Sequence, residues 1–291
     1  QNTAVGSGAA ETNTTGRNNT AVGFESFHLN TAGEDNTAIG TTALSTLTDG
    51  DDNTAVGSGA LARATTSSNN TAVGYLAMLA TTTGDRNVAV GALALDANTT
   101  SDGNTAVGFQ ALTTNTTAES NTAVGFNSLR LNTTGANNVA VGSQALDQNT
   151  TANDNVAIGI DALKANTTGA LNTAVGTSAL NANTTAASNQ AFGRRALYNN
   201  TTGTENNAFG YLALLSNTTG DFNVGVGVNA LAANTTADNN VAVGTAALAT
   251  NISGTRNTAV GTNAGKLNTA SDNVAIGFNA LDTNAGGSNN T

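Results

Sequence analysis

Small apolar residues recur along the chain every 17 residues, between polar segments rich in Asn, Thr and Gly. Residues 121–137 read NTAVGFNSLRLNTTGAN, and the next 17 residues, NVAVGSQALDQNTTAND, keep the same order. Numbered from its first Asn, the repeat is N-[TV]-A-[VI]-G-x-x-A-L-x-x-N-T-T-[GA]-x-x. Every repeat is numbered in this way, from position 1 to position 17. Such strict internal repetition is typical of stacked architectures.

The repeats keep one phase through nearly the whole chain. A single step is shorter, because Asn273 follows Asn257 by 16 residues. We expect the missing residue in the turn around Ser271 and Asp272, where a loop can absorb it. The repeats begin at Asn2, Asn19, Asn36, Asn53, Asn70, Asn87, Asn104, Asn121, Asn138, Asn155, Asn172, Asn189, Asn206, Asn223, Asn240, Asn257 and Asn273, and a partial one begins at Asn290.

The pattern predicts short strands, because it has no sustained 3.6-residue period and carries Gly and β-branched residues in each repeat. We expect one strand at positions 1–5, a second at about 7–11, a bend at the Gly of position 5 and a turn at N-T-T-G. Two short strands cannot bury a face alone, so the repeats should stack as coils of a parallel β-solenoid. About 17 coils rising about 4.8 Å each would give a rod on the order of 80 Å. Residues 1–291 are then a single repeat domain.

Asn side chains at equal places in successive coils can bond one another along the stack. Position 1 supplies one such ladder, and position 12, which is Asn in 14 of 17 repeats, supplies a second. Strand alternation puts positions 2 and 4 on one face and positions 1, 3 and 5 on the other. The outward face therefore carries either Val or bare Ala and Gly, which suits close contact with another chain.

Composition limits the interior and the partners. Most aliphatic residues are Ala, Val and Leu, which fill only a thin core. A net charge of −10 with scattered cations argues against nucleic acid. No apolar run reaches the roughly 18–20 residues that span a bilayer. Cys is absent, so the redox compartment is not indicated. Because the chain begins with Gln1, we expect a mature or excised segment.

The segment N-V-A-I-G at residues 155–159 and 273–277, with its N-T-A-V-G variants, resembles the N-S-V-A-I-G signature of the YadA-like head repeats of trimeric autotransporter adhesins. Similar repeats occur in tail fibres and other surface fibres. The resemblance covers nearly the whole chain. It implies a left-handed β-roll, three associated chains and an extracellular rod used for reach and attachment.

The N-T-T and N-I-S segments at position 12 are also glycosylation sequons. Asn30, Asn268 and Asn284 keep the Asn although the sequon is lost, which favours a structural amide over a glycan site. Glycans along one edge remain the alternative. The candidate glycosylation sites are Asn13, Asn98, Asn115, Asn132, Asn149, Asn166, Asn183, Asn200, Asn217, Asn234 and Asn251.

Two other patterns point to binding. Thr fills about half of the position-2 column and most of position 13, and regular Thr arrays can order water and bind ice; Val, Gln and Asn interrupt the position-2 column. Aromatic residues at position 6 could stack on sugars or bases, although packing between chains or over the corner is the preferred interpretation. The aromatic residues at position 6 are Phe24, Tyr75, Phe109, Phe126, Tyr211 and Phe278.

Catalysis has little support. His28 is the only His, so a His-based metal cluster or a Ser-His-Asp triad has no basis. Asp51 and Asp52 are expected to cap backbone amides in a turn. Gly225 and Gly227 form G-x-G without the third Gly or the basic partner of a phosphate site. We expect no catalytic, cofactor or metal residues.

The leading hypothesis is therefore a structural extracellular fibre or adhesin shaft without catalytic activity. Self-association is expected, as a homotrimer or as an end-to-end filament, since no atypical capping repeat protects the strand edges. A host surface or glycan is a further expected partner, and neither nucleic acid nor membrane insertion is expected. The alternative is a module that binds ice or carbohydrate through the regular face.

Overall fold

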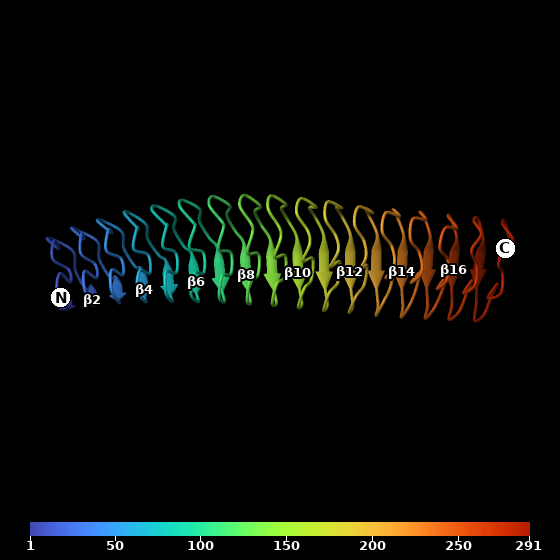
Figure 1. Ribbon diagram of the computed structural model, residues 1–291, viewed down its shortest axis with the longest axis horizontal. Helices are drawn as coiled ribbons and strands as arrows, with labels where there is room; N and C mark the ends of the chain where they lie inside the picture. The colour runs from blue at the N-terminus through green and yellow to red at the C-terminus, as the bar shows by residue number, and fades with distance from the viewer. The chain divides into compact units, whose positions relative to one another are not determined.

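The computed structural model describes residues 1–291, which divide into two compact units, residues 1–144 and 145–291. Each unit is an all-β solenoid in which every repeat forms one coil. A three-residue strand at positions 2–4 of each coil pairs in parallel with the strands of the neighbouring coils. Within each unit the coils follow one another in chain order (Figure 1). The predicted parallel β-solenoid is confirmed.

The first unit contains nine strands and the second contains eight. The strands of residues 1–144 are β1 (Thr3–Val5), β2 (Thr20–Val22), β3 (Thr37–Ile39), β4 (Thr54–Val56), β5 (Thr71–Val73), β6 (Val88–Val90), β7 (Thr105–Val107), β8 (Thr122–Val124) and β9 (Val139–Val141). The strands of residues 145–291 are β10 (Val156–Ile158), β11 (Thr173–Val175), β12 (Gln190–Phe192), β13 (Asn207–Phe209), β14 (Val224–Val226), β15 (Val241–Val243), β16 (Thr258–Val260) and β17 (Val274–Ile276). No helix of the structure has the length and apolar character needed to cross a membrane.

The pairing register equals the sequence repeat. Ala123 of β8 lies opposite Ala106 of β7 and Ala140 of β9, one repeat away on each side. The short repeat keeps the same register, because Thr258 pairs with Val274 across 16 residues. Asn268 and Asn273, at positions 12 and 1, also keep their places in the columns of Asn side chains. The missing residue therefore lies in the turn between them, as predicted.

The strand ends where the chain turns sharply at position 5. Gly108, for example, has φ +137°, a backbone conformation that L side chains rarely adopt. A Cβ built on Gly108 would lie 2.4 Å from the carbonyl oxygen of Gly125 in the next coil. Both the dihedral angle and the stacking distance therefore require Gly at this corner.

The predicted second strand at positions 7–11 is wrong. This segment is a continuous series of turns, in which positions 7 and 9 have positive φ, as at Asn127 (+54°) and Leu129 (+51°). Its backbone still bonds to adjacent coils, because Asn127 N donates to the Phe109 carbonyl at 3.1 Å and Leu112 N donates to the Ser128 carbonyl at 3.0 Å. The coils are hydrogen-bonded here without forming a β-strand.

The core is thin, as predicted, but its composition differs from the prediction. Ala at positions 3 and 8, Leu at position 9 and Asn at positions 1 and 12 point inward; Ala123, Leu129 and Asn132 are fully buried. Val and its equivalents at position 4 are instead on the outer side of the strand. The expectation that Val fills the core is therefore wrong for position 4, and the outward face is the one that carries positions 2 and 4.

Candidate functional site

The Asn side chains at position 1 form a buried column that joins coil to coil. Asn121 Oδ1 accepts the backbone N–H of Asn138 at 2.9 Å, so residues one repeat apart are direct neighbours. Asn121 Nδ2 donates to the carbonyl of Gly135, at position 15 of the same coil, at 2.9 Å. A direct amide bond is longer, with Asn138 Nδ2 at 3.2 Å from Asn121 Oδ1. The predicted ladder is confirmed, and its main partners are backbone groups.

The Asn side chains at position 12 form the second predicted ladder, in which amide bonds to amide. Asn217 Nδ2 lies 2.8 Å from Asn200 Oδ1, and Asn234 Nδ2 lies 2.8 Å from Asn217 Oδ1. Each Nδ2 also donates to the position-15 carbonyl of its own coil, as Asn217 does to Gly220 at 2.9 Å. These contacts fix the corner of the coil at its N-T-T-G turn.

Three consecutive coils replace the amide of position 12 with Leu47, Ala64 and Thr81, all fully buried. Because the exceptions are adjacent, Leu47 and Ala64 are neighbours, the Thr81 hydroxyl accepts from Asn98 Nδ2 at 3.4 Å, and few amides lose a partner. Removing both partners of a hydrogen bond in this way is nearly neutral, whereas removing one is costly. Grouping the exceptions therefore interrupts the ladder at low cost.

The candidate glycosylation sites coincide with this second ladder. Of these eleven residues, all except Asn13 are fully buried, from Asn98 to Asn251. The Nδ2 atom that would carry a glycan is a hydrogen-bond donor inside the coil, as in Asn166 to the Gly169 carbonyl at 2.9 Å. This arrangement favours the structural role; glycosylation itself stays a prediction.

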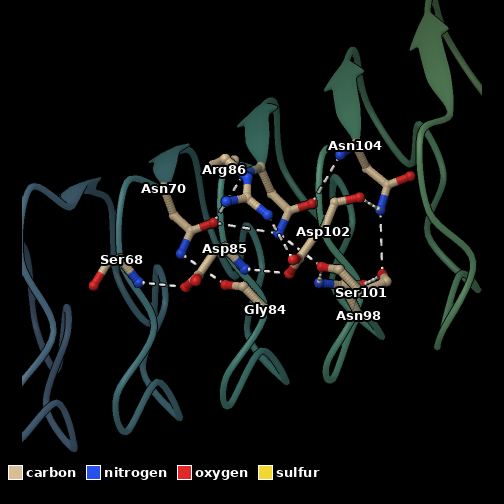
Figure 2. Close-up of polar contacts among 10 residues, drawn as sticks. Ser68, Asn70, Gly84, Asp85, Arg86, Asn98, Ser101, Asp102 and Asn104 are labelled. Atoms are coloured by element: carbon tan, nitrogen blue, oxygen red, sulfur yellow. Dashed lines mark hydrogen bonds and ion pairs between the residues drawn. The ribbon is translucent and has the colours of Figure 1, made fainter.

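A third polar column, which the sequence analysis missed, is formed at position 16 (Figure 2). Asp85 Oδ1 accepts the backbone N–H of Ser68 at 2.7 Å, and Asp102 Oδ1 accepts that of Asp85 at 2.8 Å. Asp221 and Asp238 form the same contacts in the second unit. The signal was present in the sequence as Asp, Glu or Ser recurring at position 16, but it is weaker than the Asn signal because Ala and Arg also occur there.

Three arginines pair with carboxylates at this edge, and the longest of these contacts joins Arg17 Nε to Glu34 Oε1 at 3.6 Å. Arg86 Nη2 lies 2.8 Å from Asp102 Oδ2, so Asp102 binds a guanidinium and a backbone amide together (Figure 2). Arg256 Nε lies 2.6 Å from Asp272 Oδ1 in the short repeat. The hydrogen bond from Arg256 lowers the pKa of Asp272 below its ordinary value and raises the pKa of Arg256. These exposed pairs tie adjacent coils together at the surface.

The outward side chains at positions 2 and 4 of the strands form a face that we call the strand face. No charged residue occurs at either position in any strand. Position 4 is Val, Ile or Phe throughout, and interior members are half-buried or exposed, the exposed ones including Ile39 at 39%, Val90 at 37% and Val260 at 39%. The strand face is thus an uncharged, regular row of apolar side chains.

The strand faces of the two units differ at position 2. Thr fills this position in β1–β5, β7 and β8, whereas in the second unit it does so only in β11 and β16. The hydroxyls of these threonines make no hydrogen bond within the protein, unlike those at position 13, where Thr65 Oγ1 donates to the Thr82 carbonyl at 3.0 Å. The position-2 hydroxyls are therefore available to solvent or a ligand.

The aromatic residues predicted at position 6 are exposed, from Tyr211 at 43% to Phe278 at 75%. Phe109 and Phe126 stack on each other across adjacent coils, with ring centroids 5.8 Å apart. A second stacked pair, Phe192 and Phe209, lies at position 4 on the strand face, with centroids 4.8 Å apart. The sequence pattern did not single out this pair, because the repeat gives position 4 only as an apolar residue, usually Val or Ile.

The remaining candidates have local structural contacts. His28 Nδ1 is 3.1 Å from the Gly8 carbonyl oxygen and 3.4 Å from Glu11 Oε2. Asp51 Oδ1 accepts the backbone N–H of Glu34 at 2.7 Å, which confirms the predicted capping role. Gly227 is an ordinary position-5 corner, and Gly225 lies within β14. No group of three or more His, Cys, Asp or Glu side chains is arranged to hold a metal ion, and the surface has no pocket.

Comparison of the chain with protein-family models and with curated proteins finds no match.

Proposed function

We propose that this protein is a structural, non-catalytic solenoid of an extracellular fibre or adhesin shaft, and that copies associate through the strand face. The observation that carries the proposal is the uncharged row of exposed and half-buried Val and Ile side chains at position 4. Large contiguous apolar patches on soluble proteins mark interaction surfaces. The resemblance of N-V-A-I-G to adhesin head repeats supports an assembly of three chains on a cell surface.

The size of the strand face supports an interface between copies. In the first unit, nine strands spaced about 4.8 Å apart, with positions 2–4 at about 3.3 Å per residue, cover about 43 Å by 10 Å, or roughly 430 Å². The eight strands of the second unit add roughly 380 Å², so the strand faces of both units together approach the roughly 800 Å² per partner of a standard specific interface. A second copy presents side chains with the same spacing, so the two rows can interdigitate as stacked sheets do.

The test is the oligomeric state of the full chain measured by sedimentation. We expect concentration-dependent association that the double variant Ile39→Lys, Val90→Lys abolishes, because two unpaired charges would be buried. The matched control is Thr100→Lys, Thr134→Lys, which adds the same charges at exposed position-14 residues away from the strand face. A wild-type chain that stays monomeric at high concentration, or a lysine pair on the strand face without effect, would contradict the proposal.

The free hydroxyls at position 2 favour a second candidate function, binding to ice through the face of β1–β8. Seven of these eight strands place Thr beside an apolar position-4 residue, at the regular spacing of a parallel sheet. A flat array of hydroxyl and methyl groups can hold water in an ordered layer that joins the ice lattice. The uninterrupted part of the array, β1–β5, lies in the first unit.

Thermal hysteresis separates the two candidates. Thr37→Val, Thr54→Val and Thr71→Val together remove three hydroxyls while preserving side-chain shape. An ice-binding face should lose its activity in this triple variant, whereas association between copies should be retained or strengthened. Wild-type protein without thermal hysteresis would exclude the ice-binding function and leave the structural proposal unaffected.

A further inference from the structure

The two coils that contain β12 and β13 depart from the repeat at every outward position of the strand and its corner. Amides replace Thr or Val at position 2, aromatic rings replace Val or Ile at position 4, and Arg and Tyr follow the corner Gly at position 6. We call these residues the β12–β13 patch. Its members are Gln190, Phe192, Arg194, Asn207, Phe209 and Tyr211.

The centre of the patch is an aromatic platform formed by the outward edges of two stacked rings. The rings of Phe192 and Phe209 are stacked with an interplanar angle of 6°, and the side chains are 36% and 40% exposed. No other strand has an aromatic residue at position 4. An isolated apolar platform amid smaller Val side chains can make dispersion contacts with the C–H groups of a sugar ring.

Polar groups border this platform. The side-chain amides of Gln190 and Asn207 are half-buried and have no hydrogen-bond partner within the protein. Each amide can both donate to and accept from a ligand hydroxyl. Two neighbouring amides on adjacent strands therefore suit a molecule that carries several hydroxyl groups.

The patch is also cationic, in a chain whose net charge is −10. Arg194 lies over the Tyr211 ring at 5.7 Å, with Nη1 3.4 Å from the Tyr211 hydroxyl, and the next residue, Arg195, lies over the Tyr198 ring at 5.3 Å. Neither arginine has a carboxylate partner, in contrast to Arg86 and Arg256. The aromatic rings hold both guanidinium groups in place, and apart from the Arg194 Nη1 bond to Tyr211 their N–H donors are free for an anion.

We propose that the β12–β13 patch binds a carboxylate-bearing saccharide. The C–H groups of the sugar ring pack against the outward edges of Phe192 and Phe209, the amides of Gln190 and Asn207 bond its hydroxyls, and Arg194 pairs with its carboxylate through two parallel N–H donors. Nucleic acid fits poorly, since a phosphate backbone requires more cations than two. The site is shallow and open, and it is independent of association through the other strands.

The repeat supplies variants that should fold normally. Arg194→Thr and Phe209→Val install residues found at the same positions of the coil of β11, which has Thr177 and Val175. A matched control is Phe109→Ser, Phe126→Ser, which removes an equally exposed stacked pair that lacks the amides and the arginines. Circular dichroism and melting temperature of all variants should match those of the wild type.

Calorimetric titration with a short oligogalacturonate and with its methyl ester, which lacks the negative charge, tests the proposal. We expect the wild type to bind the acid about tenfold more tightly than the ester, in line with a charge-assisted hydrogen bond. Arg194→Thr should weaken acid binding about tenfold and leave ester binding unchanged, while Phe209→Val should weaken both and the control pair neither. Absent binding of the acid, equal binding of acid and ester, or unaltered binding in both patch variants would each overturn the proposal.

Discussion

At the scale of single residues, the Asn of position 1 combines two tasks that no other side chain performs in the same space. In Asn121, Oδ1 accepts the N–H of Asn138 and Nδ2 donates to the carbonyl of Gly135, both at 2.9 Å. The side chain is fully buried, so water cannot replace either bond. The side chain contributes more than its hydrogen bonds alone, since the N–H of Asn138 would otherwise be buried without an acceptor.

Asn121→Ala should therefore destabilise the first unit by about 2 kcal/mol, because the buried N–H of Asn138 loses its acceptor, whereas the Gly135 carbonyl keeps the Nδ2 donor of Asn132. Amide hydrogen exchange should show the loss locally, with faster exchange at Asn138. Thr134→Ala, at an exposed residue, provides the control and should change exchange little. Unchanged protection at Asn138 would show that the column is dispensable.

At position 17 the backbone has positive φ, and its strain is not offset when the side chain is exposed. Phe222 (φ +57°) is 49% exposed, so little burial offsets its left-handed backbone. Phe222→Asn should raise stability by about 1 kcal/mol, the usual cost of a left-handed residue that is not Gly or Asn. Asn239→Phe, at an exposed position 17 with φ +60°, is the reciprocal change and should lower the melting temperature by a similar amount. Equal shifts of the same sign would contradict this account.

At the scale of the coil, the strand was predictable and the following segment was not. Positions 2–4 alternate between a buried Ala and outward residues, a two-residue period that predicts a strand directly. Positions 7–11 contain Leu at position 9 in a conformation that costs Leu about 1–2 kcal/mol. Burying that Leu fully contributes about 1.5–3 kcal/mol, which covers the cost. Sequence reasoning failed here because local preference pointed to extended backbone and tertiary packing decided otherwise.

In the candidate site too, the sequence predicts some features and not others. The two Asn ladders follow from spacing alone, because any stacked coil brings equal residues together. The backbone partners at position 15 and the Asp column at position 16 depend on how the coil closes, which spacing does not specify. The exposed stacked pair Phe192 and Phe209 could be predicted only if position 4 was known to point outward. Alternation in the sequence left both directions open.

The corner of the coil gives a sharp test of the stacking distance. Gly108→Ala should cost more than 3 kcal/mol, because φ is +137° and the new Cβ would lie 2.4 Å from the backbone oxygen of Gly125. Gly103→Ala is the matched control, since Gly103 also has positive φ (+68°) but no atom lies within 4 Å of its added Cβ. That change should cost only about 1 kcal/mol. Urea denaturation of both variants measures the difference, and similar costs would mean that the coils can move apart.

At the scale of the whole molecule, the fold is a sum of coils that interact with their nearest neighbours. In such an architecture the stability is approximately the sum of repeat and interface terms. The 16-residue repeat shows which part of a coil tolerates a change in length. Its strand still pairs through Thr258 and Val274, and only the turn before Asn273 is shorter. Stable stacking therefore requires that equivalent positions stay aligned in their columns. The exact number of residues in a turn matters less.

Deletion of residues 104–120 tests this additivity, because it removes one complete repeat of the first unit and joins Gly103 to Asn121. Asn87 and Asn121 then become neighbours with identical roles, so the circular dichroism per residue should be unchanged and the urea midpoint should fall only slightly. Deletion of residues 104–112 removes about half a repeat and places Thr113 where an Asn is needed. Every column after the junction would be offset by eight positions, which buries turn residues and exposes Leu and Ala. We expect that shorter deletion to unfold the coils around it, and an equally mild effect of the two deletions would show that column alignment does not determine the fold.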